Sequence, residues 1–190
     1  MLFRLADLID RHRDEIAMIE TVNCGKPLWQ TTTVEVPLVA ETFRYFAGWP
    51  TKIAGETLPV HGGHLNYTLR DPVGVVAAIP PWNYPLLLSS WKVAPALAAG
   101  NSVVLKPSSQ TPLSALKLGE LALEAGIPEG AFNVVTGPGG STGMALVRHA
   151  GVDKIAFTGE TSTGRTIMKE CAGTMKRLSL ELGGKSQIGR

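Results

Sequence analysis

A strand, a helix and a second strand are predicted for residues 73–106, VGVVAAIPPWNYPLLLSSWKVAPALAAGNSVVLK. Two short apolar runs, VGVVAAI and SVVLK, flank a stretch of helical period from Leu86 to Ala99. Strands joined by a crossover of this length lie parallel, and continuously apolar strands are typical of sheets with helices on both faces. This unit predicts an α/β fold.

The same alternation continues toward the C-terminus. The apolar runs FNVVT, KIAFT and RLSLEL alternate with stretches of helical period at 114–125, 144–149 and 167–172. This order predicts an open, doubly wound parallel sheet, Rossmann-like in architecture. Ligands bind such sheets beyond the carboxyl ends of the strands, so the residues that follow each strand form the candidate site.

Two helices are predicted before this region. Apolar residues at three- and four-residue intervals from Leu5 to Ile19 predict one helix that ends near Gly25 and Pro27. A second helix is expected over 34–47 with Pro37 in its first turn, where a missing N–H is tolerated.

A β-hairpin is predicted between these helices and the sheet. Apolar and polar residues alternate on both sides of Gly62 and Gly63. A two-stranded ribbon is marginal alone, so we expect it to pack against another element, such as a second subunit. The expected organisation is N-terminal helices over 1–52, a hairpin arm over 53–71 and a Rossmann-like domain over 72–190.

Composition and charge exclude several classes of protein. The 18 basic and 16 acidic residues give a net charge of +2 without a basic run, which argues against nucleic acid as a partner. The two cysteines fit neither a disulfide scaffold nor a zinc site. The N-terminus lacks the pattern of a signal peptide, and the most apolar stretch, 85–100, is shorter than the roughly 20 residues of a membrane span. We expect a soluble, cytoplasmic protein without a metal.

Asn83 follows the first predicted strand within the rigid sequence PPWNYP. Its side-chain amide could be a fixed hydrogen-bond donor, or it could simply cap the next helix. Lys92 lies on that helix, where a lysine that extends along the surface into solvent is the simpler interpretation.

Polar and glycine-rich segments follow the middle strands. Lys106 precedes PSSQTP, a combination that suits a ribose or phosphate but also an ordinary capped loop. The segment GPGGSTG at 137–143 misses the dinucleotide fingerprint G-x-G-x-x-G by one residue and follows a late strand, so its glycines could serve only a tight turn.

The last two strands also end in candidate residues. GETSTG at 159–164 opens a helix whose free N–H groups favour an anion, although Glu160 would repel that anion unless it points away or caps the helix. Glu181 ends the last strand, where a carboxylate can act as a general base or can simply be exposed.

The motifs PWNYP, LKPSSQTP, FTGETSTG and LELGGK occur together and in this order, and the chain resembles the aldehyde dehydrogenase superfamily from about Leu2 to Lys185. The resemblance implies oxidation of an aldehyde to a carboxylic acid with NAD or NADP, through a thiohemiacetal and a thioester. It implies that Asn83 donates to the oxyanion, that Glu181 activates water and that Lys92 takes part in proton relay. The cofactor-binding residues that it implies are Ile79, Pro80, Trp82, Lys106, Ser109, Gly139, Gly143, Thr158, Gly159, Glu160 and Leu182.

The chain departs from the family pattern in its cysteines and its ending. The family's nucleophilic cysteine is expected beyond Glu181 in a separate catalytic domain, and neither Cys24 nor Cys171 matches it. The ending Gln187–Arg190 replaces the usual continuation and reads as a truncation or reading-frame scar. The leading interpretation is the cofactor-binding half of an NAD(P)-dependent aldehyde dehydrogenase, and we expect this half alone to be inactive. The alternative is a catalytically inactive nucleotide-binding or subunit-associating remnant of such an enzyme. An acyl-phosphate reductase fits PWNYP and LELGGK less well.

Cofactor preference and substrate are less constrained. Ser109 stands where many relatives have a glutamate that binds the adenosine ribose, so we expect NADP to be accepted, with Lys106 pairing its 2′-phosphate. Tyr84, Leu88 and Trp91 provide an apolar wall that does not identify the aldehyde. By resemblance, the hairpin is an arm through which the full-length enzyme forms a homo-oligomer.

Overall fold

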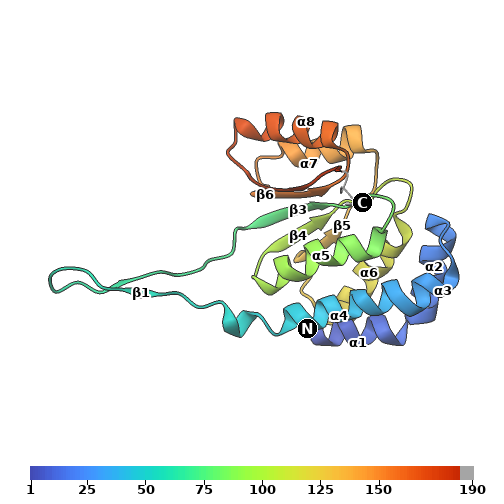
Figure 1. Cartoon of the computed structure of the whole chain (residues 1–190), viewed down its shortest axis with the longest axis horizontal. Helices are drawn as coiled ribbons and strands as arrows, with labels where there is room; N and C mark the ends of the chain where they lie inside the picture. The colour runs from blue at the N-terminus through green and yellow to red at the C-terminus, as the bar shows by residue number, and fades with distance from the viewer. Residues whose placement is uncertain (185–190) are drawn as a thin grey trace, which may run out of the picture.

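The computed structural model describes residues 1–184 and contains a parallel sheet between two layers of helices (Figure 1). The five strands of this sheet are β3 (Val75–Ile79), β4 (Ser102–Leu105), β5 (Phe132–Val134), β6 (Lys154–Thr158) and β7 (Arg177–Glu181). They lie in the order β5-β4-β3-β6-β7, and all neighbours are parallel. The predicted doubly wound sheet is confirmed. Lys185, which ends LELGGK, and the ending Gln187–Arg190 lie outside the described residues.

The sheet has a switch point between β3 and β6. The chain builds β4 and β5 outward on one side of β3 and then returns to place β6 and β7 on the other side. Ile79 at the end of β3 is in register with Phe157 of β6. Connections that diverge from two adjacent strands leave a crevice at their carboxyl ends, where a ligand can enter.

Helices cover the sheet unequally (Figure 1). One face is covered by α5 (Pro85–Ala98) and α6 (Leu113–Glu124), and the other by α7 (Met144–Arg148) and α8 (Thr161–Ala172). A further layer packs beneath α5 and α6; it comprises α1 (Leu2–Arg11), α2 (Arg13–Cys24), α3 (Leu28–Gln30), the π-helical turn η1 (Thr31–Glu35) and α4 (Val36–Ala47). Short turns η2 (Pro50–Lys52) and η3 (Gly139–Gly143) complete the described helices. None of the helices within residues 1–184 has the length and apolar character needed to cross a membrane.

Alternating residues of β3 join two hydrophobic cores. Ala78 packs into the core beneath the sheet, with α1, α4, α5 and α6. Ala77 and Ile79 point to the opposite face and pack with Ile155 and Ile167. Because successive side chains of a strand point to opposite faces, an apolar β3 fixes both helical layers to the sheet.

Two local expectations require correction. The first predicted helix is broken at His12 (φ −96°, ψ 18°) into α1 and α2, which lets α1 pack on α4 while α2 packs on η1 and α6. In β7 every second residue is exposed, since no described helix covers the face of β6 and β7 on the side of α5.

The predicted hairpin is confirmed. Strands β1 (Thr57–Leu58) and β2 (Asn66–Tyr67) pair antiparallel, and the ribbon extends far from the body of the chain (Figure 1). All residues of the segment 51–72 are exposed. The arm leaves from the amino-terminal edge of the sheet, opposite the carboxyl ends of the strands.

Gly74→Ala is expected to lower the free energy of unfolding by about 1–3 kcal/mol. Gly74 has φ +122°, and an added Cβ would collide with the Asp153 carboxylate that accepts the Val75 N–H at 2.8 Å. Urea unfolding measures the change. Gly173→Ala is the matched control, because Gly173 has φ −70° and open space around it; equal losses in both variants would contradict the argument.

Candidate functional site

A cavity of about 390 Å³ lies between η3, α7 and α8, next to the switch point. Backbone and small side chains form much of its wall. Its lining includes the predicted residues Ile79, Gly139 and Gly143, together with Gly140, Met144, Val147, Phe157, Ser162, Thr163, Thr166 and Ile167. The cavity therefore combines a glycine turn with the first turn of α8, whose free N–H groups favour an anion.

The glycines of η3 leave the backbone accessible. An added Cβ at Gly139 or Gly140 would meet no atom within 4 Å, so these residues border open space. Gly137 adopts φ +144° and packs closely on Thr142, which shapes the turn. A ligand can therefore approach the bare backbone of this turn.

Glu160 and Leu182 flank the start of α8. Glu160 occupies the N-cap position of α8 and is exposed. Its side chain makes no capping hydrogen bond, so the expectation that it caps the helix is not met. Leu182 packs on Gly164 in the first turn of α8. The Gly159 N–H donates to the Glu181 carbonyl at 3.0 Å, which links the ends of β6 and β7.

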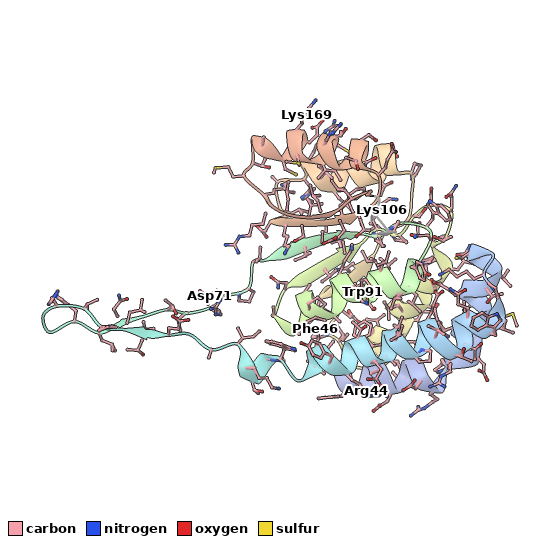
Figure 2. The ribbon with its side chains drawn as sticks, viewed as in Figure 1. Arg44, Phe46, Asp71, Trp91, Lys106 and Lys169 are labelled. Carbon is pink, nitrogen blue, oxygen red and sulfur yellow. The ribbon has the colours of Figure 1, made fainter. Side chains whose placement is uncertain are left out.

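Lys106 is buried beneath the glycine turn. Its side chain is 3% exposed and lies 3.8 Å from the position of an added Cβ at Gly143. The ammonium donates to the Pro107 carbonyl at 2.9 Å, and burial lowers the pKa of Lys106. Ser109 is exposed nearby on the same loop. Figure 2 shows Lys106 at the carboxyl edge of the sheet.

A larger cavity of about 710 Å³ lies on the opposite face, between α5 and the uncovered strands β6 and β7. It brings together Lys92, Thr158 and Glu181 from three elements distant in sequence. The Lys92 ammonium donates to Thr158 Oγ1 at 2.6 Å rather than extending along the surface into solvent. Burial lowers the pKa of Lys92, and the nearby Glu181 carboxylate opposes this effect. The apolar wall of the cavity includes Leu88 and Trp91; Figure 2 shows Trp91 on α5.

Asn83 lies in the exposed loop that joins β3 to α5, between Trp82 and Tyr84. Tyr84 is the N-cap residue of α5, and the first free N–H of this helix is bound by Glu20, so Asn83 does not cap it. Its amide makes no hydrogen bond to residues 1–184 and is not part of either cavity wall. Pro80 is buried at the start of the loop.

Glu20 is the residue at this loop that sequence reasoning missed. It is 1% exposed on α2, and burial raises the pKa of its carboxyl group. Its position four residues after the buried Ile16, on the same apolar stripe, was the available signal.

The cysteines do not provide an activated nucleophile. Cys171 is buried, and its Sγ lies 3.9 Å from the Val147 carbonyl; Cys24 is half-buried at the end of α2. Burial raises the pKa of both thiols, which disfavours the reactive thiolate. Within residues 1–184 there is no group of three His, Cys, Asp or Glu residues that could bind a metal ion.

Comparison with known proteins shows similarity along almost the whole chain. Residues 1–189 match the model of the aldehyde dehydrogenase family. Phenylacetaldehyde dehydrogenase from Pseudomonas fluorescens is 55% identical over 99% of this chain and 39% of its own length. Human retinal dehydrogenase 2 is 51% identical over 98% of this chain and 36% of its own length.

Solved structures give the same picture. The NAD⁺ complex of an aldehyde dehydrogenase from Bacillus cereus superposes with a TM-score of 0.96 at 50% identity. The alignment covers 97% of this chain and 38% of that structure. The chain thus spans between 36% and 39% of the length of these three relatives.

Lys92→Met is expected to remove a pH dependence of stability. Because burial lowers the pKa of Lys92, the folded chain binds this proton less tightly than the unfolded chain. The free energy of unfolding should therefore rise with pH between the folded-state pKa and the ordinary value of 10.5, and the variant should lose this rise. Urea unfolding over that pH interval measures it.

Thr158→Val is the control for this prediction. It keeps the Lys92 ammonium, so its free energy of unfolding should still rise with pH. A Lys92→Met variant with the pH profile of the parent chain would contradict the assignment.

Proposed function

Because this chain belongs to the aldehyde dehydrogenase family, we propose that it forms the dinucleotide-binding part of an enzyme that oxidises an aldehyde to a carboxylic acid. The observation that supports this most directly is the pair of cavities on the two faces of the sheet, one lined by the glycine turn and the first turn of α8 and one containing Lys92, Thr158 and Glu181. In this proposal residues 72–190 bind the cofactor, 1–52 support that domain and 53–71 form an arm.

The residues present fit a nicotinamide dinucleotide. The bare backbone at Gly139 and Gly140 and the first turn of α8 would bind its phosphates and adenosine. Trp82, Thr158 and Gly159, at the ends of β3 and β6, would bind the part that crosses the carboxyl edge. When bound, the dinucleotide supplies the hydride acceptor.

Three side chains would take part in the reaction. Asn83 would donate its side-chain amide to the oxygen that becomes an oxyanion, and a fixed donor of this kind lowers the barrier by about 2.7–4 kcal/mol. Glu181 would take a proton from the water that hydrolyses the thioester. Lys92, which donates to Thr158 and lies near the Glu181 carboxylate, would take part in the relay of that proton.

The nucleophile would come from outside these 190 residues. Neither thiol of the chain is activated, and the relatives are more than twice as long as the matched region. We therefore propose that the isolated chain binds dinucleotide without oxidising aldehydes. Aldehyde-dependent reduction of NAD⁺ by the purified chain would contradict this.

Assembly and location are further parts of the proposal. The exposed arm supports association with a second copy of the enzyme, because an isolated ribbon gains stability only by pairing or packing. The two free cysteines are consistent with the reducing cytoplasm.

A joined enzyme tests the proposed function. Residues 1–184 would replace the matching part of the Pseudomonas fluorescens phenylacetaldehyde dehydrogenase, and reduction of NAD⁺ would be followed with phenylacetaldehyde. We expect turnover, and Asn83→Ala should lower kcat by about 10²–10³-fold. Gln110→Ala, in a neighbouring exposed loop, is the control. Full activity of Asn83→Ala would refute the oxyanion role.

Ser109→Glu is expected to weaken NADP⁺ binding to the chain by about tenfold relative to NAD⁺, because the added carboxylate repels the 2′-phosphate. Isothermal titration of both cofactors gives the ratio of Kd values. Gln110→Glu adds the same charge one residue away and should change this ratio less. A parent chain that binds NAD⁺ far more tightly than NADP⁺ would contradict the role of Ser109.

A further inference from the structure

Glu20 caps helix α5 from another helix. Its Oε1 accepts the Leu86 N–H at 3.1 Å in a buried environment. Pro85 has no N–H, so the Leu86 N–H is the first backbone donor of α5. A carboxylate at this position satisfies one of the free donors of the helix and interacts favourably with the helix dipole.

Two more contacts join the same N-terminal segment to the loop. Lys26 Nζ lies 3.8 Å from the centroid of the Tyr84 ring, and Cys24 Sγ lies 3.9 Å from the Trp82 carbonyl oxygen. The segment around the end of α2 therefore contacts the chain immediately before and after Asn83, and at the start of α5.

The cation beneath Tyr84 is itself held in place. Lys26 forms an ion pair with Glu35 at 2.6 Å, and Gln30 donates to the same carboxylate at 2.8 Å. Glu35 is 2% exposed and ends the π-helical turn η1. A π-helical turn widens a helix locally and is often found where a side chain must be directed to a particular site.

We propose that Glu20 is a positioning residue that fixes the loop carrying Asn83 by capping α5, a role that rests on the oxyanion function proposed for Asn83. Trp82, Asn83 and Tyr84 are all exposed, so packing inside the loop does not hold them. The contacts from α2 and the segment after it supply that constraint.

The cost of burying Glu20 supports a specific role. Its carboxyl group is 1% exposed, and burial raises its pKa, although the neighbouring Ser114 hydroxyl and the Leu86 N–H oppose this effect. An apolar side chain of similar size would avoid this desolvation but could not accept the Leu86 N–H. The Glu20 carboxylate therefore provides a cap on α5 that a methionine at this position could not provide.

Nuclear magnetic resonance of the ¹⁵N-labelled 190-residue chain tests the proposal. Glu20→Met should speed hydrogen exchange of the Leu86 amide at least tenfold and shift the side-chain amide resonances of Asn83. Glu20→Gln keeps an acceptor oxygen and should restore both signals. Glu20→Asp keeps the charge but shortens the reach, so it should resemble Glu20→Met and serves as the second variant if Glu20→Met folds poorly.

Ile16→Ala is the matched control, because Ile16 is 2% exposed on the same helix, one turn before Glu20, and its side chain has no group that could accept the Leu86 N–H. It should lower stability without shifting the Asn83 resonances. Unchanged Asn83 and Leu86 signals in Glu20→Met, or equal shifts in Ile16→Ala, would overturn the proposal.

Kinetic measurements on the joined enzyme and dinucleotide binding by the parent chain separate the positioning role of Glu20 from the proposed function. In the joined enzyme, Glu20→Met should lower kcat by about tenfold with little change in the KM for NAD⁺, since a misplaced donor weakens the chemical step. Absence of dinucleotide binding by the parent chain would count against the proposed function, whereas the resonance test of the loop would stand by itself.

Discussion

The pairing of β3 with β4 on one side and β6 on the other is the constraint on which the rest of the structure depends. It places the carboxyl ends of β3 and β6 next to each other while their connections diverge to opposite faces of the sheet. The α5 connection therefore lies on one face and α8 on the other. A ligand at this edge can contact both faces, and each face has its own cavity there.

The uncovered face of β6 and β7 has a chemical consequence. Thr158 and Glu181 lie on this face, and Lys92 reaches them from α5. A helix over these strands would bury the three groups; without one they form the wall of an open cavity.

The N-terminal helices act on the site through their packing. Apolar residues such as Val36, Val39 and Phe43 are fully buried between α4 and the helices around it. Surface ion pairs, among them Arg44 with Asp10 at 2.6 Å, join α4 to α1 but contribute little energy individually, about 0–1 kcal/mol. Burial therefore holds this layer in place, which brings Glu20 and Lys26 to the loop that contains Asn83.

The sequence by itself determined the parallel α/β fold, the places of its strands and the residues at their carboxyl ends. Apolar runs and helical periods are local patterns that can be recognised in the sequence. Two strands joined by a helical crossover lie parallel, so the strand direction also follows from the order of these patterns. The glycine turn at 137–143 and the polar start of α8 were predicted for the same reason, since turns and helix ends have characteristic residues close together in the chain.

Only the tertiary structure decided which of these residues meet. The hydrogen bonds from Lys92 to Thr158 and from the Leu86 N–H to Glu20 each join residues 66 positions apart. The break at His12, the burial of Lys106 and the open face of β7 also depend on what packs nearby rather than on local pattern. A one-dimensional pattern shows which face of an element is apolar, whereas the partner of a polar side chain is set by the packing of distant segments.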